Sequence, residues 1–400
     1  MAGFAPYRAS FAGKDVPQEL DFPLGEYRRR QNDVRRAMAK QGLDLLVLGS
    51  LPDICWLTGF QTPSASTFAA LLVPAEGPLT LQVIDHEYGC ARYVSCAERI
   101  ESFPWFEPVQ GIVQHARLID EMLPPSSASV GIDAKAPVAV DAIEQHLGQR
   151  RTEWLRIDQL VPQLRRSKSP LELDAMRESG RITRRSVEDT LAALCPGLRD
   201  SDVAAILLAR MVEHGSEFPA MGPFVATGLR SSLIHTTWKR RPIEPGDHVF
   251  IEPAASFKRY NAPMMRTAIM GQPTRLAERL ADAVTTTLAI LFETIRAGRT
   301  GHEIAVAAAK GFEPIRDEIF FQGAFGYAVG LALPSDWAEG STPFIAEGID
   351  EPLVSGMTLH LPVAARVVGF GGVAMSETVL VTDAGCESLT AESRGLVVVR

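Results

Sequence analysis

Two side chains in the C-terminal half of the sequence have the chemistry of an acid–base pair. Glu252 ends the apolar run Val249-Phe250-Ile251, where burial raises the pKa of a carboxyl group unless a cation compensates. His235 follows the apolar pair Leu233-Ile234. Its imidazole titrates near neutrality, so it can protonate a leaving nitrogen or accept a proton from water. Glu252 is a candidate nucleophile or general base, and His235 a candidate acid–base group. The alternatives are a surface glutamate and a packed histidine.

The elements that must position this pair form a region of helices followed by strands. Apolar runs predict strands over residues 247–253, 266–270, 357–362 and 378–382. Helical spacing predicts helices over residues 170–194, 201–214, 275–297 and 302–310. Helices that precede a returning antiparallel sheet are typical of an α+β domain. We expect this domain to occupy residues 166–400.

The N-terminal part of the chain has a different pattern. A helix predicted over 26–40 is followed by short apolar runs at 45–48, 69–73 and 79–84. This alternation predicts an α/β domain with a mixed sheet over residues 1–165. The boundary between the two predicted domains is marked by a polar segment that is followed by the start of a helix. There Ser169 can cap a helix, Pro170 occupies its first turn and Glu172 completes a capping box.

Composition excludes several classes of function. With 40 basic and 48 acidic residues the formal net charge is -8, so no nucleic-acid partner is indicated. The five cysteines form no CxxC pair, which excludes a disulfide framework and favours the reducing cytoplasm. No apolar run is long enough to cross a bilayer, so no membrane partner is expected. The sequence also lacks the glycine-rich phosphate loops, the HExxH motif and the GxSxG motif.

A longer pattern around Glu252 carries a family resemblance. Pro245-Gly246-Asp247, Tyr260 and Arg266-Thr267 stand at the spacing of a strand–loop–strand motif. The pattern resembles the creatinase/aminopeptidase superfamily, which includes the M24-like peptidases. The resemblance implies a creatinase-like N-terminal domain and a catalytic C-terminal domain of the pita-bread fold.

The peptidases of that superfamily hold metal ions, and this sequence departs from them at the ligand positions. Those positions fall here at Glu252, Pro263, Val329, about Leu361 and Ser376. Proline, valine and leucine have no side-chain donor atom. We therefore expect no metal and no other cofactor.

Two further stretches are similar to ectoine hydrolases, a metal-free branch. One runs from Glu252 to Thr267. The other comprises Gly326-Tyr327, Gly330-Leu331, Pro334, Asp336-Trp337 and Glu339. The resemblance implies a metal-independent hydrolase that opens a C–N bond of a small cyclic amidine, converting ectoine or 5-hydroxyectoine to N-acetyl-diaminobutyrate.

The resemblance also implies roles for particular residues. Glu252 and His235 would be catalytic. The substrate-binding candidates are Tyr260, Arg266, Tyr327, Trp337, His360 and Glu377. The expected partners are a small-molecule substrate and, in a homodimer, a second copy of the chain. The rival hypotheses are a creatinase-like amidinohydrolase acting on another nitrogenous solute, a metal-dependent Xaa-Pro aminopeptidase and a catalytically inactive binding module.

Overall fold

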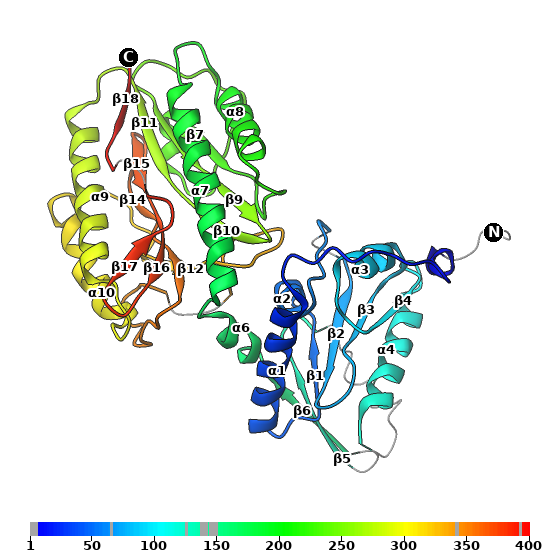
Figure 1. Cartoon of the computed structure of the whole chain (residues 1–400). Coiled ribbons are helices and arrows are strands. Elements are labelled where there is room, and N and C mark those ends of the chain that lie inside the picture. Colours follow the sequence, from blue (N-terminus) through cyan, green and yellow to red (C-terminus); the bar gives the residue numbers. More distant parts are fainter. Residues whose placement is uncertain are drawn as a thin grey trace. The chain divides into compact units, whose positions relative to one another are not determined.

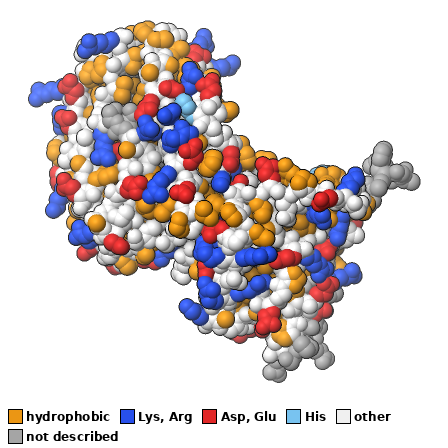
Figure 2. Space-filling model, viewed as in Figure 1, with side chains coloured by type: hydrophobic (Ala, Val, Ile, Leu, Met, Phe, Trp, Pro, Cys, Tyr) orange, Lys and Arg blue, Asp and Glu red, His pale blue; other side chains and the backbone are white. Residues whose placement is uncertain are grey.

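The chain divides into two compact units, Met1–Arg165 and Arg166–Arg400 (Figure 1). A computed structural model describes residues 7–64, 67–124, 127–136, 143, 151–340, 344–391 and 394–400. Figure 2 shows acidic and basic side chains interspersed over the visible face. None of the described helices combines the length and apolar character that crossing a membrane requires.

The first unit is built on one mixed sheet. Its strands are β1 (Leu45–Leu48), β2 (Ala69–Pro74), β3 (Thr80–Ile84), β4 (Arg99–Phe103), β5 (Ser127–Ile132) and β6 (Arg151–Arg156). They lie in the order β4-β3-β2-β1-β5-β6, with β1 antiparallel to β2 and parallel to β5. The helices are α1 (Leu24–Lys40), α2 (Leu51–Thr58), α3 (Tyr88–Val94), α4 (Pro108–Met122) and α6 (Leu160–Arg165), with short 3-10 turns η1 (Tyr7–Phe11) and η2 (Asp85–Glu87). This confirms the predicted α/β unit.

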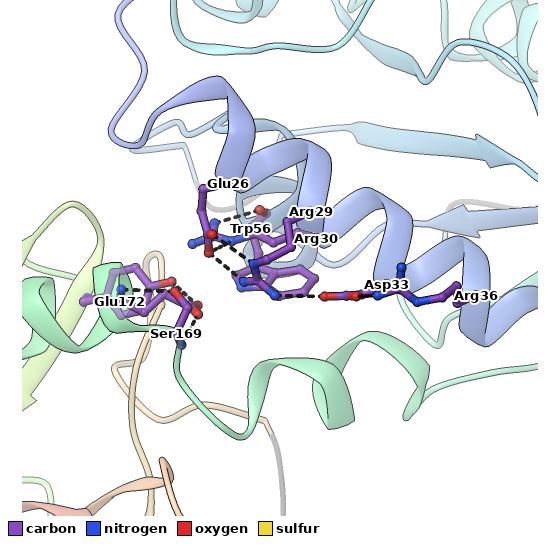
Figure 3. A network of polar contacts seen from close by, with 9 residues as sticks. Glu26, Arg29, Arg30, Asp33, Arg36, Trp56, Ser169 and Glu172 are labelled. Carbon is purple, nitrogen blue, oxygen red and sulfur yellow. Dashed lines mark hydrogen bonds and ion pairs between the residues drawn. The ribbon is translucent and has the colours of Figure 1, made fainter.

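A fully buried arginine joins the first two helices of this unit (Figure 3). The Arg30 guanidinium carbon lies 4.7 Å from the ring centre of Phe22, 5.5 Å from that of Tyr27 and 5.2 Å from that of Trp56. Its Nε donates to Glu26 at 3.0 Å, and its Nη1 donates to the Trp56 carbonyl at 2.9 Å. Because the charge is both paired and stacked on aromatic faces, its burial is compensated.

The described residues of the second unit form two four-stranded sheets and two strand pairs. The strands are β7 (Phe224–Thr227), β8 (His248–Glu252), β9 (Ala254–Phe257), β10 (Tyr260–Pro263), β11 (Arg266–Met270), β12 (Tyr327–Ala328), β13 (Thr358–His360), β14 (Val363–Val367), β15 (Gly371–Met375), β16 (Thr378–Val381), β17 (Cys386–Ser388) and β18 (Val397–Val399). The sheets have the orders β18-β11-β8-β7 and β12-β13-β16-β17, and the pairs are β9 with β10 and β14 with β15.

Helices packed in pairs cover the strands in the described part of this unit (Figure 1). They are α7 (Pro170–Ala192) with α8 (Asp200–Glu213), and α9 (Arg275–Thr294) with α10 (Gly301–Ala309); η3 (Gly228–Ser232) and η4 (Lys310–Ile315) are short turns. One hydrophobic core joins α7 and α8 to β7, β8 and β11. Another joins α9 and α10 to the strands from β13 to β16. Helices packed on largely antiparallel sheets confirm the predicted α+β class.

The start of α7 has the predicted capping box. The Ser169 hydroxyl accepts from the Glu172 backbone N–H, and the Glu172 carboxylate accepts from the Ser169 N–H at 2.8 Å (Figure 3). Just before the cap, Lys168 forms a buried ion pair with Glu339. These contacts fix the first turn of the second unit.

The two faces of β8 have different surroundings. Val249 and Ile251 belong to the core beneath α7 and α8. Phe250, which points to the other face, packs with residues of β14 and β15 in a smaller cluster. Because side chains alternate along a strand, Glu252 shares the face of Phe250. The fold therefore directs Glu252 away from the helices and toward the β14–β15 hairpin.

Candidate functional site

Glu252 is buried at the end of β8, with 6% of its surface exposed. Burial raises the pKa of its carboxyl group to about 8, and the charge of Arg366 opposes that rise. Within the described part of the chain, no group donates a hydrogen bond to this carboxyl group. A buried acid without a donor holds its proton at neutral pH and ionises readily only when a cation approaches.

Arg366, which sequence reasoning did not single out, carries a charge that acts on Glu252. It lies in β14, is buried, and donates to the Gln322 side-chain oxygen at 3.0 Å. Burial lowers the pKa of its guanidinium, while the charge of Glu252 raises it. The available signal was the arginine itself, which interrupts the otherwise apolar run Val363-Ala364-Ala365-Arg366-Val367. Such a residue in a buried strand needs a partner.

His235 reaches this face of the sheet through an aromatic contact. Its ring stacks on Phe224 at 5.6 Å, and Phe224 stands directly opposite Glu252 in the β7–β8 register. Residues paired in this way share a face of the sheet. The Phe224 ring, on which His235 stacks, therefore lies beside the Glu252 side chain. Trp337 packs edge-on against Phe224 at 5.7 Å. His235 is exposed and has φ of 55°, a strained conformation for a residue with a side chain.

A chain of hydrogen-bonded side chains lies beside Glu252. Trp337 Nε1 donates to the Tyr327 hydroxyl at 2.9 Å, and that hydroxyl lies 2.9 Å from His360 Nδ1. His360 Nε2 lies 2.6 Å from the Ser376 hydroxyl oxygen. Burial lowers the pKa of His360 to about 3, so its imidazole is neutral. Burial first, and then the charge of Glu252, raise the pKa of Tyr327, which therefore keeps its proton.

The structure does not bring the other predicted binding residues into this cluster. The Tyr260 hydroxyl donates to Glu172 at 2.5 Å, at the start of α7. Arg266 pairs with Ile251 in the β8–β11 register, which places it on the sheet face opposite Glu252. Its Nη1 donates to the Ser376 carbonyl at 2.9 Å. Glu377 accepts from Arg394 at 2.7 Å.

The described side chains around Glu252 do not have the donors of a metal centre. Among the described residues, no group of three or more His, Cys, Asp or Glu side chains converges. The side chains around Glu252 offer a single carboxylate, and the Arg366 guanidinium acts on that carboxylate as its opposing charge. A divalent cation requires several anionic or neutral donors, which this group of side chains does not supply. The donor set does not fit a metal centre.

The fold is that of a two-domain protein whose C-terminal unit has the pita-bread architecture. The prolidase of Pyrococcus horikoshii superposes with a TM-score of 0.79 at 22% identity, covering 92% of this chain and all of that one. The dipeptidase PepE of Mycobacterium ulcerans superposes with a TM-score of 0.80 at 22% identity, covering 94% of this chain and 99% of that one. These likenesses confirm the fold.

The chain belongs to metallopeptidase family M24. The family model matches residues 174–383, and the model for the creatinase/prolidase N-terminal domain matches residues 30–167. The ectoine hydrolase of Halomonas elongata is 27% identical over 96% of this chain and its own full length. The Xaa-Pro dipeptidase of Pyrococcus horikoshii is 24% identical over 90% of this chain and 96% of its own. The predicted superfamily is confirmed, and the chain is a hydrolase of the M24 family.

Proposed function

We propose that this chain is a metal-independent hydrolase that opens a C–N bond of a small cyclic amidine, with ectoine or 5-hydroxyectoine as substrate and N-acetyl-diaminobutyrate as product. The observation that carries the proposal is the buried Glu252 carboxyl group, which lies among aromatic rings and receives no hydrogen bond from the described residues. A bound cationic amidine adds to the charge of Arg366 and so favours the ionised form of such an acid. Contact with the Phe224 and Trp337 rings adds about 1–2 kcal/mol when desolvated.

The chemistry needs one oxygen and one proton. The ring amidine has an electrophilic carbon between two nitrogens. Water supplies the oxygen that finally bonds to this carbon, one C–N bond breaks, and the departing nitrogen takes a proton. Glu252 serves either as the nucleophile that first attacks the carbon or as the base that activates water. His235, exposed above Phe224, supplies the proton.

Three rival functions make different demands on this site. An Xaa-Pro peptidase, the activity in the name of one relative, needs the metal centre that the donor set does not fit. A creatinase-like amidinohydrolase would use the same acid and imidazole on an open-chain substrate. An inactive binding module requires neither a strained His235 nor a buried carboxyl group with a raised pKa.

One set of assays separates these functions. The purified protein is incubated with ectoine, with 5-hydroxyectoine, with creatine and with the dipeptide Ala-Pro, each with and without added Mn²⁺, and products are followed by proton NMR. We expect only ectoine or 5-hydroxyectoine to be consumed, with or without the metal. Cleavage of Ala-Pro that requires Mn²⁺, or no turnover of either ectoine, would overturn the proposal.

Two further expectations belong to this proposal. The protein acts in the cytoplasm, because its cysteine pattern suits a reducing compartment. It forms a homodimer, as the resemblance to the metal-free branch implies. Sedimentation equilibrium checks the dimer against the 43.5 kDa chain.

A further inference from the structure

The Arg366 side chain lies on the face of its hairpin that packs against Phe250. Ala364 and Ala374 pair across β14 and β15 and belong to the small cluster around Phe250. Arg366 is two residues beyond Ala364, so its side chain takes the same face. It pairs with Gly372, and a Cβ atom on that glycine would lie 3.2 Å from Arg366 Cγ. The arginine stem therefore crosses the hairpin where another side chain would otherwise stand.

Gln322 holds one nitrogen of the Arg366 guanidinium and leaves one edge of the group open. The Gln322 amide nitrogen donates to the Pro362 carbonyl at 2.9 Å, so its amide oxygen is directed to Arg366, whose Nη1 donates to it at 3.0 Å. Arg366 Nε and Nη2 donate to no described residue, and neither atom is sealed from solvent, although only 7% of the residue is exposed. These two nitrogens form the edge of the planar fork that matches a carboxylate.

Glu252 and Arg366 act on each other without touching. Each charge changes the pKa of the other group. The carboxyl oxygens and the guanidinium nitrogens nevertheless lie more than 4.0 Å apart, and no ion pair joins them. The Glu252 oxygens, like the open edge of Arg366, are not sealed from solvent. Burying an acid and a guanidinium without pairing them costs free energy, so this arrangement suits a ligand that brings the opposite charge to each.

Two other buried arginines of this unit are engaged elsewhere. Arg259 forms an ion pair with Glu217 and stacks on Phe218 at 4.0 Å. Arg266 lies on the sheet face opposite Glu252. Among the described residues, Arg366 is therefore the cation available to an anionic group of a molecule bound at Glu252.

We propose that the site takes a zwitterion, with the substrate carboxylate bound by the open edge of Arg366 and the cationic amidine lying against Glu252. The identity of the cation rests on the proposed function, whereas the carboxylate site at Arg366 does not. In ectoine the carboxylate is attached to the ring carbon next to an amidine nitrogen, so both charges belong to one small ring. Two fixed contacts orient such a ring and direct its amidine carbon toward Glu252. Arg366 then selects substrates that carry a carboxylate.

The carboxylate site is tested without turnover. Protein labelled with ¹⁵N-arginine is titrated with sodium acetate at pH 7, where Glu252 holds its proton, and the side-chain Nε–H signals are followed by NMR. The signal that is missing from Arg366→Lys assigns Arg366. We expect this signal to shift in a saturable way with acetate and not with sodium chloride at the same ionic strength. No shift with acetate, or an equal shift with chloride, overturns the proposal whether or not ectoine is a substrate.

Selection by Arg366 is tested with ectoine and its carboxamide, which keeps the amidine and lacks the negative charge. Wild-type kcat/KM should be about 10–100-fold higher for ectoine, the range expected for hydrogen bonds to a charged group. In Arg366→Gln this preference should fall below about threefold, mainly through a higher KM for ectoine. Loss of the Arg366 charge also affects Glu252, but it does so for both compounds, so their ratio isolates the carboxylate contact.

Arg296→Gln, which removes an exposed arginine after α9, is the matched control and should keep the wild-type preference. An unchanged preference in Arg366→Gln would overturn the proposal and leave the proposed function standing. If the wild type consumed neither compound, the proposed function would fail, and the acetate titration would decide the carboxylate site by itself.

Discussion

Replacing Glu252 by glutamine should make the stability of the protein less sensitive to pH. The folded protein holds the Glu252 proton up to about pH 8, whereas the unfolded chain releases it above the ordinary value of 4.5. Between these values the unfolded state binds fewer protons than the folded state, so wild-type stability falls as pH rises and levels off above about pH 8. Glutamine has the same shape as glutamate and does not titrate. The fall in stability with rising pH is therefore absent from Glu252→Gln.

The size of the effect follows from the same two pKa values. A difference of one pKa unit corresponds to about 1.4 kcal/mol, so the span from 4.5 to about 8 amounts to about 5 kcal/mol. Compared with the wild type, Glu252→Gln should gain about 1.4 kcal/mol in free energy of unfolding for each pH unit within this window. The two proteins should therefore be similar in stability near pH 4.5, and the variant clearly more stable at pH 8.5.

Urea unfolding at about pH 5, 7 and 8.5, with the transition of each unit fitted separately, measures this gain. Glu278→Gln is the matched control, because Glu278 is exposed in the first turn of α9. The free energy of unfolding of the Glu278→Gln variant should equal that of the wild type at every pH. Equal pH dependence in Glu252→Gln and Glu278→Gln would refute the reasoning, because it would mean that Glu252 ionises normally in the folded protein.

Four further predictions concern turnover of ectoine. Glu252→Gln should lower kcat by about 10³ or more, and Glu278→Gln should leave it unchanged; similar effects of the two would make Glu252 an ordinary residue. His235→Ala should lower kcat by about 10²–10⁴ with a smaller change in KM, and an unchanged kcat would remove His235 from the mechanism. In steady-state assays, kcat/KM of the wild type should rise with pH and level off above about pH 8, since Glu252 acts as the carboxylate; a profile without this rise would contradict that role. EDTA should leave turnover unchanged, because Pro263 cannot bind a cation; stoichiometric zinc or manganese by elemental analysis, with activity lost in EDTA, would contradict this.

Local patterns predicted the long helices of the second unit and several of its strands, whereas the strand pairs β9–β10 and β14–β15 were not predicted. The strand expected at 266–270 matches β11, and the capping box at Ser169 is present. The helix expected over 275–297 ends at Thr294, because Ile295 turns to an extended conformation. Nothing in the sequence before Gly298 marks that turn, since its direction depends on packing against other strands.

The candidate site was harder to predict from the sequence than the fold was. Glu252, His235 and Trp337 gather around Phe224, whose position opposite Glu252 depends on strand register. Strand register also explains why Arg266 lies on the sheet face opposite Glu252. A position close to Glu252 in the sequence does not reveal which face of the sheet a side chain occupies. Arg366 was missed because its partner lies on a strand more than a hundred residues away.

The Glu172 carboxylate at the start of α7 accepts two hydrogen bonds, one from the helix cap and one from a neighbouring strand. One oxygen caps the helix through the Ser169 N–H, and the other accepts from the Tyr260 hydroxyl on β10 at 2.5 Å. Helix ends usually fray, so their amide hydrogens exchange with solvent through small local openings. Here the first turn cannot open without releasing a buried strand pair. The amides at the start of α7 should therefore exchange as slowly as those in the centre of the helix, and this turn should open only when the whole second unit unfolds.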